Sequence, residues 1–174
     1  MKLARLFLFL LILTPSTFAQ RAETMAVKVY FHPDKLDPEW NDCTKVHPVN
    51  RTIPKTTSVA MAALNELLKG PIGEEAKAFS GFGPPETDGI LRSVNVKNRT
   101  AYVNFTKRML MQMGNATTSC GGGFFSMTDA TLMQFPTIKK VVYAVEGSTS
   151  DFYEWVQVGE CPYGRTHCAR SNFK

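Results

Sequence analysis

The sequence contains few of the residues from which catalytic centres are usually built. Each of its three histidines, His32, His47 and His167, lies beside a proline or a cysteine. It also lacks a Gly-x-Ser-x-Gly motif, the turn that exposes the nucleophilic serine in one large class of hydrolases. A hydrolase needs a nucleophile, a base and an orienting group that meet in space. The sequence therefore predicts a protein without enzymatic activity or cofactor, and a hydrolase with an unrecognised site is the alternative.

The longest apolar run is too short to cross a membrane as a helix. Residues 6–13 are eight consecutive apolar residues, whereas a spanning helix needs about 20. Lys2 and Arg5 precede the run, and Thr17-Phe18-Ala19 places small residues at the two positions that a signal peptidase recognises. We expect residues 1–19 to be a signal peptide and the mature chain to be secreted or periplasmic, without a transmembrane span. A retained membrane anchor is the alternative.

The mature chain also lacks a strong excess of charge. The full sequence has 20 basic residues, two of which belong to the expected leader, and this leaves 18 against 15 acidic residues and a formal charge of +3. A nucleic-acid-binding surface needs basic residues clustered along one face. Here they are scattered among acidic and neutral neighbours, as at Lys97, Arg99, Lys107, Arg108, Lys139 and Lys140. This distribution is typical of a solvated surface, and we expect no nucleic-acid partner.

The cysteines are few but even in number. Cys43, Cys120, Cys161 and Cys168 all follow the expected leader, and an even count in an oxidising compartment favours two disulfides. Three pairings are possible. We favour Cys161–Cys168, which closes a small loop, and this leaves Cys43–Cys120 as a long-range link. A zinc site built from Cys161, His167 and Cys168 is the alternative, but a fourth ligand nearby and close cysteine pairs are both lacking.

The hydrophobic pattern predicts an α+β domain. Period-two alternation or β-branched apolar runs indicate strands at residues 27–31, 44–49, 91–96, 101–105 and 138–145, the last a buried central strand. A helix over residues 59–68 follows Thr56-Thr57-Ser58 and ends at Gly70-Pro71, and a second helix opens at a capping box at residues 126–129 and ends at Pro136. Loops are expected at residues 32–42, 72–88 and 114–123. The order β-(β)-α-β-β-α-β favours a mixed or antiparallel sheet covered on one face by two helices.

Four runs stand out in order along the chain: Leu67-Leu68-Lys69-Gly70-Pro71, the hairpin of residues 90–105, residues 130–136 with the sequence ATLMQFP, and residues 141–147 with the sequence VVYAVEG. Together they resemble the GerMN domain family, which is associated with sporulation and spore germination. The resemblance implies an exported α/β domain without established enzymatic activity that binds or scaffolds components of the cell envelope. Together with the leader, it predicts three parts: a signal peptide (1–19), a GerMN-like domain (20–159) and a cysteine-containing tail (160–174).

Two groups of residues are candidates for ligand binding. Gly122 and Gly123 precede the second predicted helix, where backbone N–H groups can meet an anion, although a flexible link beside Cys120 is the plainer interpretation. Tyr153 and Trp155 can stack on a sugar or anchor a protein partner. Their alternation also fits a strand that buries one face, which is the interpretation we favour.

The partners implied by the family resemblance are a cell-envelope protein or a cell-wall component. Copies of the chain can also associate by edge-strand addition, which would give a homo-oligomer through backbone hydrogen bonds. A module that binds a cell-wall glycan or peptide through the loop at residues 72–88 and the aromatic C-terminal region is the alternative function.

Overall fold

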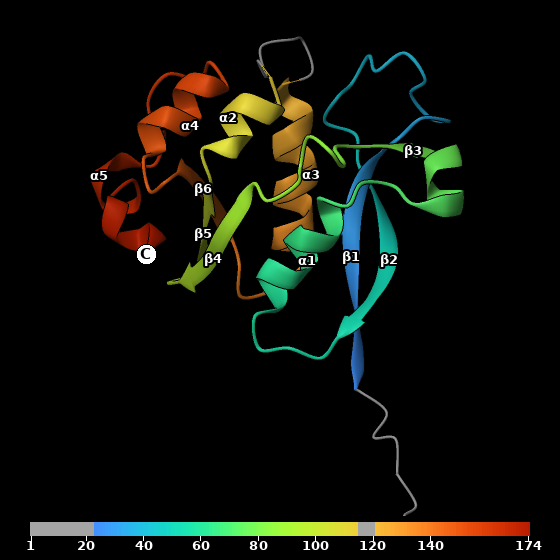
Figure 1. Ribbon diagram of the computed structural model, residues 1–174, viewed down its shortest axis with the longest axis horizontal. Helices are drawn as coiled ribbons and strands as arrows, with labels where there is room; N and C mark the ends of the chain where they lie inside the picture. The colour runs from blue at the N-terminus through green and yellow to red at the C-terminus, as the bar shows by residue number, and fades with distance from the viewer. Residues whose placement is uncertain (1–22, 115–120) are drawn as a thin grey trace, which may run out of the picture.

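The computed structural model describes residues 23–114 and 121–174, so the expected leader and Cys120 lie outside the described residues (Figure 1). The strands are β1 (Thr24–Pro33), β2 (His47–Pro54), β3 (Phe79–Ser80), β4 (Leu91–Lys97), β5 (Thr100–Phe105) and β6 (Lys140–Val145). The α-helices are α1 (Val59–Leu67), α2 (Arg108–Gln112), α3 (Gly121–Met133), α4 (Thr149–Trp155) and α5 (Gly164–His167). Two 3-10 helices, η1 (Gly73–Lys77) and η2 (Arg170–Phe173), complete the described elements.

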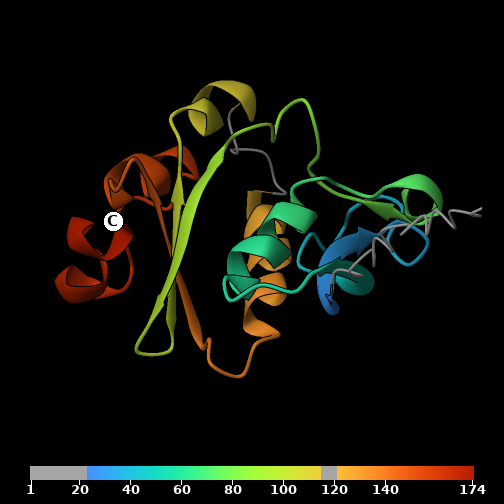
Figure 2. The same ribbon diagram turned by 60° about the horizontal axis from the view of Figure 1, so that its bottom comes forward.

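The strands form two sheets of three. One sheet has the order β2-β1-β3 and is antiparallel, and the other has the order β4-β5-β6, in which β5 and β6 run parallel. Helices α1 and α3 lie between the two sheets, while the C-terminal segment lies on the outer side of the second sheet (Figure 2). The α+β class predicted from the sequence is confirmed, but the single expected sheet is divided in two.

Strand β1 follows the predicted alternation, since Val27, Val29 and Phe31 are buried. The second predicted strand lies further along the chain than expected, at residues 47–54 instead of 44–49. A turn at Asp37 explains the shift. Its two carboxylate oxygens accept hydrogen bonds from the backbone N–H groups of Asn41 (3.0 Å) and Asp42 (2.7 Å), and a carboxylate that captures backbone donors in this way holds the segment out of the sheet.

The predicted hairpin of β4 and β5 is confirmed. Its two turn residues, Asn98 (φ 49°) and Arg99 (φ 60°), are both left-handed, as a two-residue turn between twisted strands requires. All six residues of β5 are buried, and this strand lies between β4 and β6. The central strand is therefore β5, and not the segment at residues 138–145 that was expected in that place.

Helix α3 begins at Gly121, before the predicted capping box. The hydroxyl groups expected to cap the helix bond backwards inside it: Ser126 Oγ donates to Gly122 O (3.1 Å) and Thr128 Oγ1 donates to Phe124 O (2.7 Å). Phe124 is buried and packs against Phe105. Aromatic packing thus stabilises a first turn for which the local sequence gives a weak signal.

The prediction of a strand at residues 152–156 is wrong. Residues 152–155 belong to helix α4, and Val156 is its C-cap. The Ser148 side chain caps the helix by accepting a hydrogen bond from Asp151 N (3.2 Å). Phe152, Tyr153 and Val156 are buried, a spacing that suits one helical face. The expected loops also contain short elements that were not predicted, namely η1 and β3 within residues 72–88, while α2 follows β5.

The second sheet is covered on both faces. Its inner face contributes Val103, Phe105 and Tyr143 to the main core, where Tyr143 stacks on Phe152 with ring centroids 4.8 Å apart. Its outer face buries a smaller cluster of Tyr102, Val142 and Ala144 under Phe173 of η2. The C-terminal tail therefore supplies one layer of the fold.

Candidate functional site

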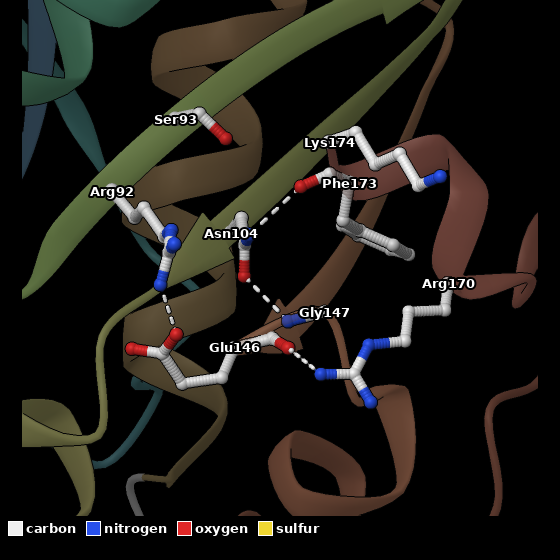
Figure 3. A pocket seen from close by; sticks show the side chains of 8 residues that line it. All are labelled: Arg92, Ser93, Asn104, Glu146, Gly147, Arg170, Phe173 and Lys174. Atoms are coloured by element: carbon white, nitrogen blue, oxygen red, sulfur yellow. Dashed lines mark hydrogen bonds and ion pairs between the residues drawn. The ribbon is translucent and has the colours of Figure 1, made fainter.

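An open cleft of about 420 Å³ lies where the second sheet meets the C-terminal tail (Figure 3). Four segments line it: β4, the end of β5, the turn after β6, and the tail from η2 onward. The lining residues are Arg92, Ser93, Asn104, Glu146, Gly147, Arg170, Phe173 and Lys174. Charged and amide groups dominate this set, so the cleft suits a polar ligand.

The buried side chain of Asn104 joins three of these segments. Asn104 lies near the end of β5 and is only 3% exposed. Its Nδ2 donates to the carbonyl oxygen of Phe173 (2.8 Å), and its Oδ1 accepts from the backbone N–H of Gly147 (2.9 Å). Both ends of the amide are thus satisfied away from water, where an unpaired polar group would be costly. The turn and the tail are held in place whether or not a ligand is bound.

The turn after β6 brings Glu146 and Gly147 to the cleft. Both residues are left-handed, with φ values of 49° and 79°, and Val145 and Ser148 exchange backbone hydrogen bonds across them (2.9 and 2.8 Å). A Cβ atom on Gly147 would lie 3.1 Å from Cγ of Arg170. Glycine at this position therefore allows both the tight turn and the close approach of the arginine side chain.

The charges in the cleft are unequal. Arg92 and Arg170 contribute two guanidinium groups, whereas Glu146 contributes one side-chain carboxylate. Arg92 forms an ion pair with the Glu146 carboxylate, while Arg170 Nη2 donates to the Glu146 carbonyl oxygen (3.0 Å). Among the described residues, Arg170 has no carboxylate within ion-pair distance. The cleft can therefore accept a negative group, since a guanidinium binds oxyanions through several N–H donors.

Comparisons with known proteins identify the family to which the chain belongs. A family model described as sporulation and spore germination matches residues 28–151, which is most of the chain. The chain belongs to the GerMN family. Among solved structures, the tandem GerMN domains of the sporulation protein GerM from Bacillus subtilis share 21% identity over 72% of this chain, with a TM-score of 0.49. The chain spans 40% of that tandem structure.

Two further structures resemble this GerMN domain. The first GerMN domain of GerM from Bacillus subtilis is 22% identical, covers 71% of this chain and 84% of its own length, and has a TM-score of 0.49. A structure described as a lipoprotein from Clostridium perfringens is 19% identical, covers 71% of this chain and 75% of its own length, and has a TM-score of 0.41. No curated protein matches the chain.

The family match does not include all the residues that line the cleft. The match ends at residue 151, so Arg170, Phe173 and Lys174 lie beyond it. Membership of the GerMN family, which is a sporulation and germination family and not a known enzyme family, confirms the resemblance seen in the sequence. Within residues 23–114 and 121–174, no helix is both long and apolar enough to span a membrane.

The predicted aromatic candidates lie in the core of the GerMN domain and not in the cleft. Tyr153 is 3% exposed, so its ring has no free face for a sugar. Trp155 is half-buried, packs edge-on against Phe124, and donates its indole N–H to Gly114 O (2.6 Å). Both residues pack against the core, the role favoured from the sequence, although a helix and not a strand carries them.

The two predicted glycines lie in the first turn of α3. Gly122 is exposed, and nothing lies within 4 Å of the position that a Cβ would occupy. Gly123 is buried, and a Cβ there would lie 3.4 Å from the carbonyl oxygen of Cys43 and 3.7 Å from the Trp40 ring. Gly123 thus allows a close approach of two chain segments, and neither glycine lines the cleft.

The cysteines follow the expected pairing where the structure describes them. Cys161 and Cys168 form a disulfide with a Cα–Cα distance of 6.2 Å, and not a zinc site. Cys43 is disulfide-bonded, and its expected partner, Cys120, lies outside the described residues. Among the residues that are described, no three His, Cys, Asp or Glu side chains are placed to hold a metal ion.

The histidines have separate structural surroundings. His32 is buried, stacks on Trp40 with ring centroids 3.9 Å apart, and lies with Nε2 3.0 Å from Asp37 O. His167 lies with Nδ1 3.0 Å from the hydroxyl group of Tyr102. His47 begins β2 and is exposed. None of the three lines the cleft.

A buried polar cluster connects α3 to β6. The Tyr143 hydroxyl donates to Asp129 Oδ1 (2.5 Å) and lies 2.7 Å from Thr128 Oγ1. Burial raises the pKa of Asp129, and the hydrogen bond from Tyr143 offsets only part of this rise. Burial together with the nearby Asp129 charge also raises the pKa of Tyr143. The cluster holds α3 against β6, and none of its three residues lines the cleft.

The sequence contained signals for some cleft residues but not for the site as a whole. Asn104 lies between the apolar residues Val103 and Phe105 of a buried strand, which indicates a specific hydrogen-bonding role. Glu146-Gly147 stood out in the family motif. Arg170 carried no local signal, because its position depends on the tail folding back over β5.

Proposed function

We propose that this GerMN domain acts outside the cytoplasm by binding a component of the cell envelope, and that it does not catalyse a reaction. Three features support the proposal: the expected leader at residues 1–19, membership of the GerMN family, and the cleft between the second sheet and the tail. The family membership supports the cellular context, while the cleft provides a surface for recognition.

The observation that carries the proposal is the cleft with its fixed walls. Asn104 holds the turn and the tail through two hydrogen bonds of 2.8 and 2.9 Å, so little ordering is left to be done when a ligand binds, and preorganisation of this kind favours affinity. The groups that line the cleft suit recognition more than catalysis. Glu146, the one carboxylate side chain among the lining residues, is paired with Arg92.

Export and binding can be tested with the full chain, without a tag, and an antibody for detection. Cells that produce it are divided into cytoplasm, membrane, wall and medium. We expect a mature N-terminus at Gln20 and an absence of free thiols, both measured by mass spectrometry, and recovery outside the cytoplasm. Recovery of the reduced chain with Met1 in the cytoplasm would show that the location is wrong.

Binding is then measured with the purified mature chain and isolated envelope material. We expect saturable co-sedimentation with walls or membranes, without release of soluble fragments during the incubation. Fragment release that is abolished by His47→Ala or His32→Ala would show that the domain is a hydrolase. Failure to co-sediment with every envelope fraction would contradict the binding role.

A further inference from the structure

We infer that the cleft binds an oxyanionic group, a carboxylate or a phosphate, and that Arg170 is its main ligand. The inference deepens the proposed function, on which it rests for the source of the group but not for the existence of the site. Arg170 comes from η2, Arg92 from β4, and Figure 3 shows them on either side of Glu146. Residues distant in the sequence thus place two guanidinium groups at one opening.

The electrostatic argument concerns the charge that remains after internal pairing. Glu146 neutralises Arg92 in an ion pair. Arg170 donates one N–H to the Glu146 carbonyl oxygen, which is a neutral acceptor. A guanidinium group has five N–H donors. Arg170 therefore keeps its full charge and several donors for a ligand.

The geometric argument concerns how firmly Arg170 is held. Its stem packs over Gly147, where a Cβ would lie 3.1 Å from Arg170 Cγ and 3.3 Å from Nε. The tail that carries Arg170 is fixed by the hydrogen bond from Asn104 to Phe173 O and by the Cys161–Cys168 disulfide. A planar donor group held in one place binds a carboxylate or phosphate in a fork geometry, with less loss of side-chain entropy than a free surface arginine.

The cleft can be tested with simple ions before any envelope ligand is known. The purified mature chain is titrated with inorganic phosphate and, separately, with acetate at constant ionic strength, while amide chemical shifts are followed by NMR. We expect saturable shifts for the Gly147 N–H and the Asn104 side-chain amide. Shifts that remain linear with concentration, or that are confined to residues outside the cleft, would overturn the inference.

Two substitutions separate a ligand-binding arginine from a structural one. Arg170→Gln should weaken phosphate binding about tenfold or more, because it removes a charge-assisted hydrogen-bond donor. Arg165→Gln is the matched control, since Arg165, like Arg170, is an exposed arginine of the same tail but lines a different hollow, and it should change binding less than twofold. Equal effects of the two variants would contradict a specific site.

Glu146→Gln should change the affinity for phosphate in the opposite direction. It removes the carboxylate that competes for Arg92, so phosphate binding should strengthen by a few fold. A purely structural role for Glu146 and Arg170 would make both variants bind more weakly, and that result would overturn the inference. Thermal unfolding of each variant shows whether the fold is intact, and His167 and Asn104 side-chain resonances report on the tail directly.

The source of the oxyanion is distinguished with wall material. Co-sedimentation is compared for walls before and after extraction of covalently bound phosphate polymers. Loss of binding after extraction identifies a phosphate group, and retention that acetate competes away identifies a carboxylate. If Arg170→Gln co-sediments as well as the unaltered chain, the oxyanion site is wrong while the proposed function stands. If phosphate titrates the cleft but no envelope fraction binds, the site stands and the proposed function fails.

Discussion

The side-chain amide of Gln134 pairs with the backbone of Lys28 in both directions. The Lys28 N–H donates to Gln134 Oε1 (2.8 Å), and Gln134 Nε2 donates to the Lys28 carbonyl oxygen (2.6 Å). Two residues along β1, the N–H of Tyr30 donates to Thr131 Oγ1 (3.1 Å). Strand β3 pairs only with the far end of β1. The side chains of Thr131 and Gln134 therefore act as a substitute strand: they bond the β1 backbone groups of Lys28 and Tyr30 that β3 does not reach.

Replacing Gln134 should loosen this edge. Gln134→Ala leaves a donor and an acceptor of Lys28 without their partners, and we expect the free energy of unfolding to fall by about 1–3 kcal/mol. Hydrogen exchange of the Lys28 amide should accelerate accordingly. Met133→Ala is the control, because Met133 is an adjacent residue that is 44% exposed. Equal losses in the two variants, measured by urea unfolding, would contradict the substitute-strand role.

The same contact shows which way the other edge of this sheet faces. Lys28 points its N–H and C=O away from β2, so its partner Asn50 points both groups outward. The outward-facing positions of β2 are then Pro48, Asn50, Thr52 and Pro54. Two of the four are prolines, which have no N–H to donate and block strand addition. Strand β2 is thus a poor edge for the self-association considered from the sequence.

Replacing these prolines should allow copies of the chain to associate through the β2 edge. We expect the double variant Pro48→Thr, Pro54→Thr to associate at lower protein concentration than the unaltered chain, because four successive outward N–H groups become available. Light scattering after size-exclusion chromatography measures the change. Pro33→Thr on β1 is a control for loss of a proline in the same sheet. An unaltered chain that already associates through β2, shown by protection of Asn50 and Thr52 amides at high concentration, would contradict the prediction.

Two glycines should respond to alanine with opposite signs. Gly147→Ala places a Cβ at φ 79° and 3.1 Å from Arg170 Cγ, so we expect a loss of about 1–3 kcal/mol in the free energy of unfolding. Gly122→Ala meets no atom within 4 Å on a helix, so we expect a gain of up to about 1 kcal/mol. Urea unfolding measures both. A loss at Gly122 would indicate that its backbone has a role besides forming the helix.

The ion pair between Arg51 and Glu75 should make the free energy of unfolding depend on pH in the acidic range. Burial raises the pKa of Glu75, but hydrogen bonds from Arg51 and from the Ile72 N–H, together with the Arg51 charge, lower it more, so the pKa lies below its ordinary value. A carboxyl group with a lower pKa in the folded state stabilises the fold above its unfolded pKa, and this stability is lost as the pH falls through the folded pKa.

We therefore expect Glu75→Gln to reduce the free energy of unfolding at pH 7 by about 1–3 kcal/mol and to flatten its decline below about pH 5. The control is Glu74→Gln, whose side chain is 86% exposed and pairs with Lys77 on the surface. It should change the stability by less than about 0.5 kcal/mol. Urea unfolding between pH 3 and pH 7 compares them, and parallel pH profiles for Glu75→Gln and the unaltered chain would contradict the assignment.

Local signals explain which elements the sequence predicted well. Gly70-Pro71 ended α1 where expected, because Gly70 is left-handed (φ 69°) and proline cannot extend a helix. Asn98 and Arg99 adopted the positive φ values that a short hairpin turn needs. In each case, the residues that determine the conformation lie next to one another in the chain.

Longer-range packing explains the errors. Residues 152–156 fit a strand by parity, but Phe152 belongs to an aromatic cluster with Tyr143 and Phe124, and the cluster favours the helix. The parallel pairing of β5 with β6 joins segments on opposite sides of α2 and α3. The cleft depends on that pairing and on the return of the tail, so Arg170 could not be placed beside Glu146 from the sequence.

The outer layer formed by Phe173 has a practical consequence for cloning. A recombinant fragment trimmed at residue 151, where the family match stops, would expose Tyr102, Val142 and Ala144 to solvent and remove Phe152 from its stack on Tyr143. Such a fragment would be prone to precipitate. A ligand screen with it would give no hits because the fragment is misfolded and lacks part of the cleft, and not because the protein has no ligand.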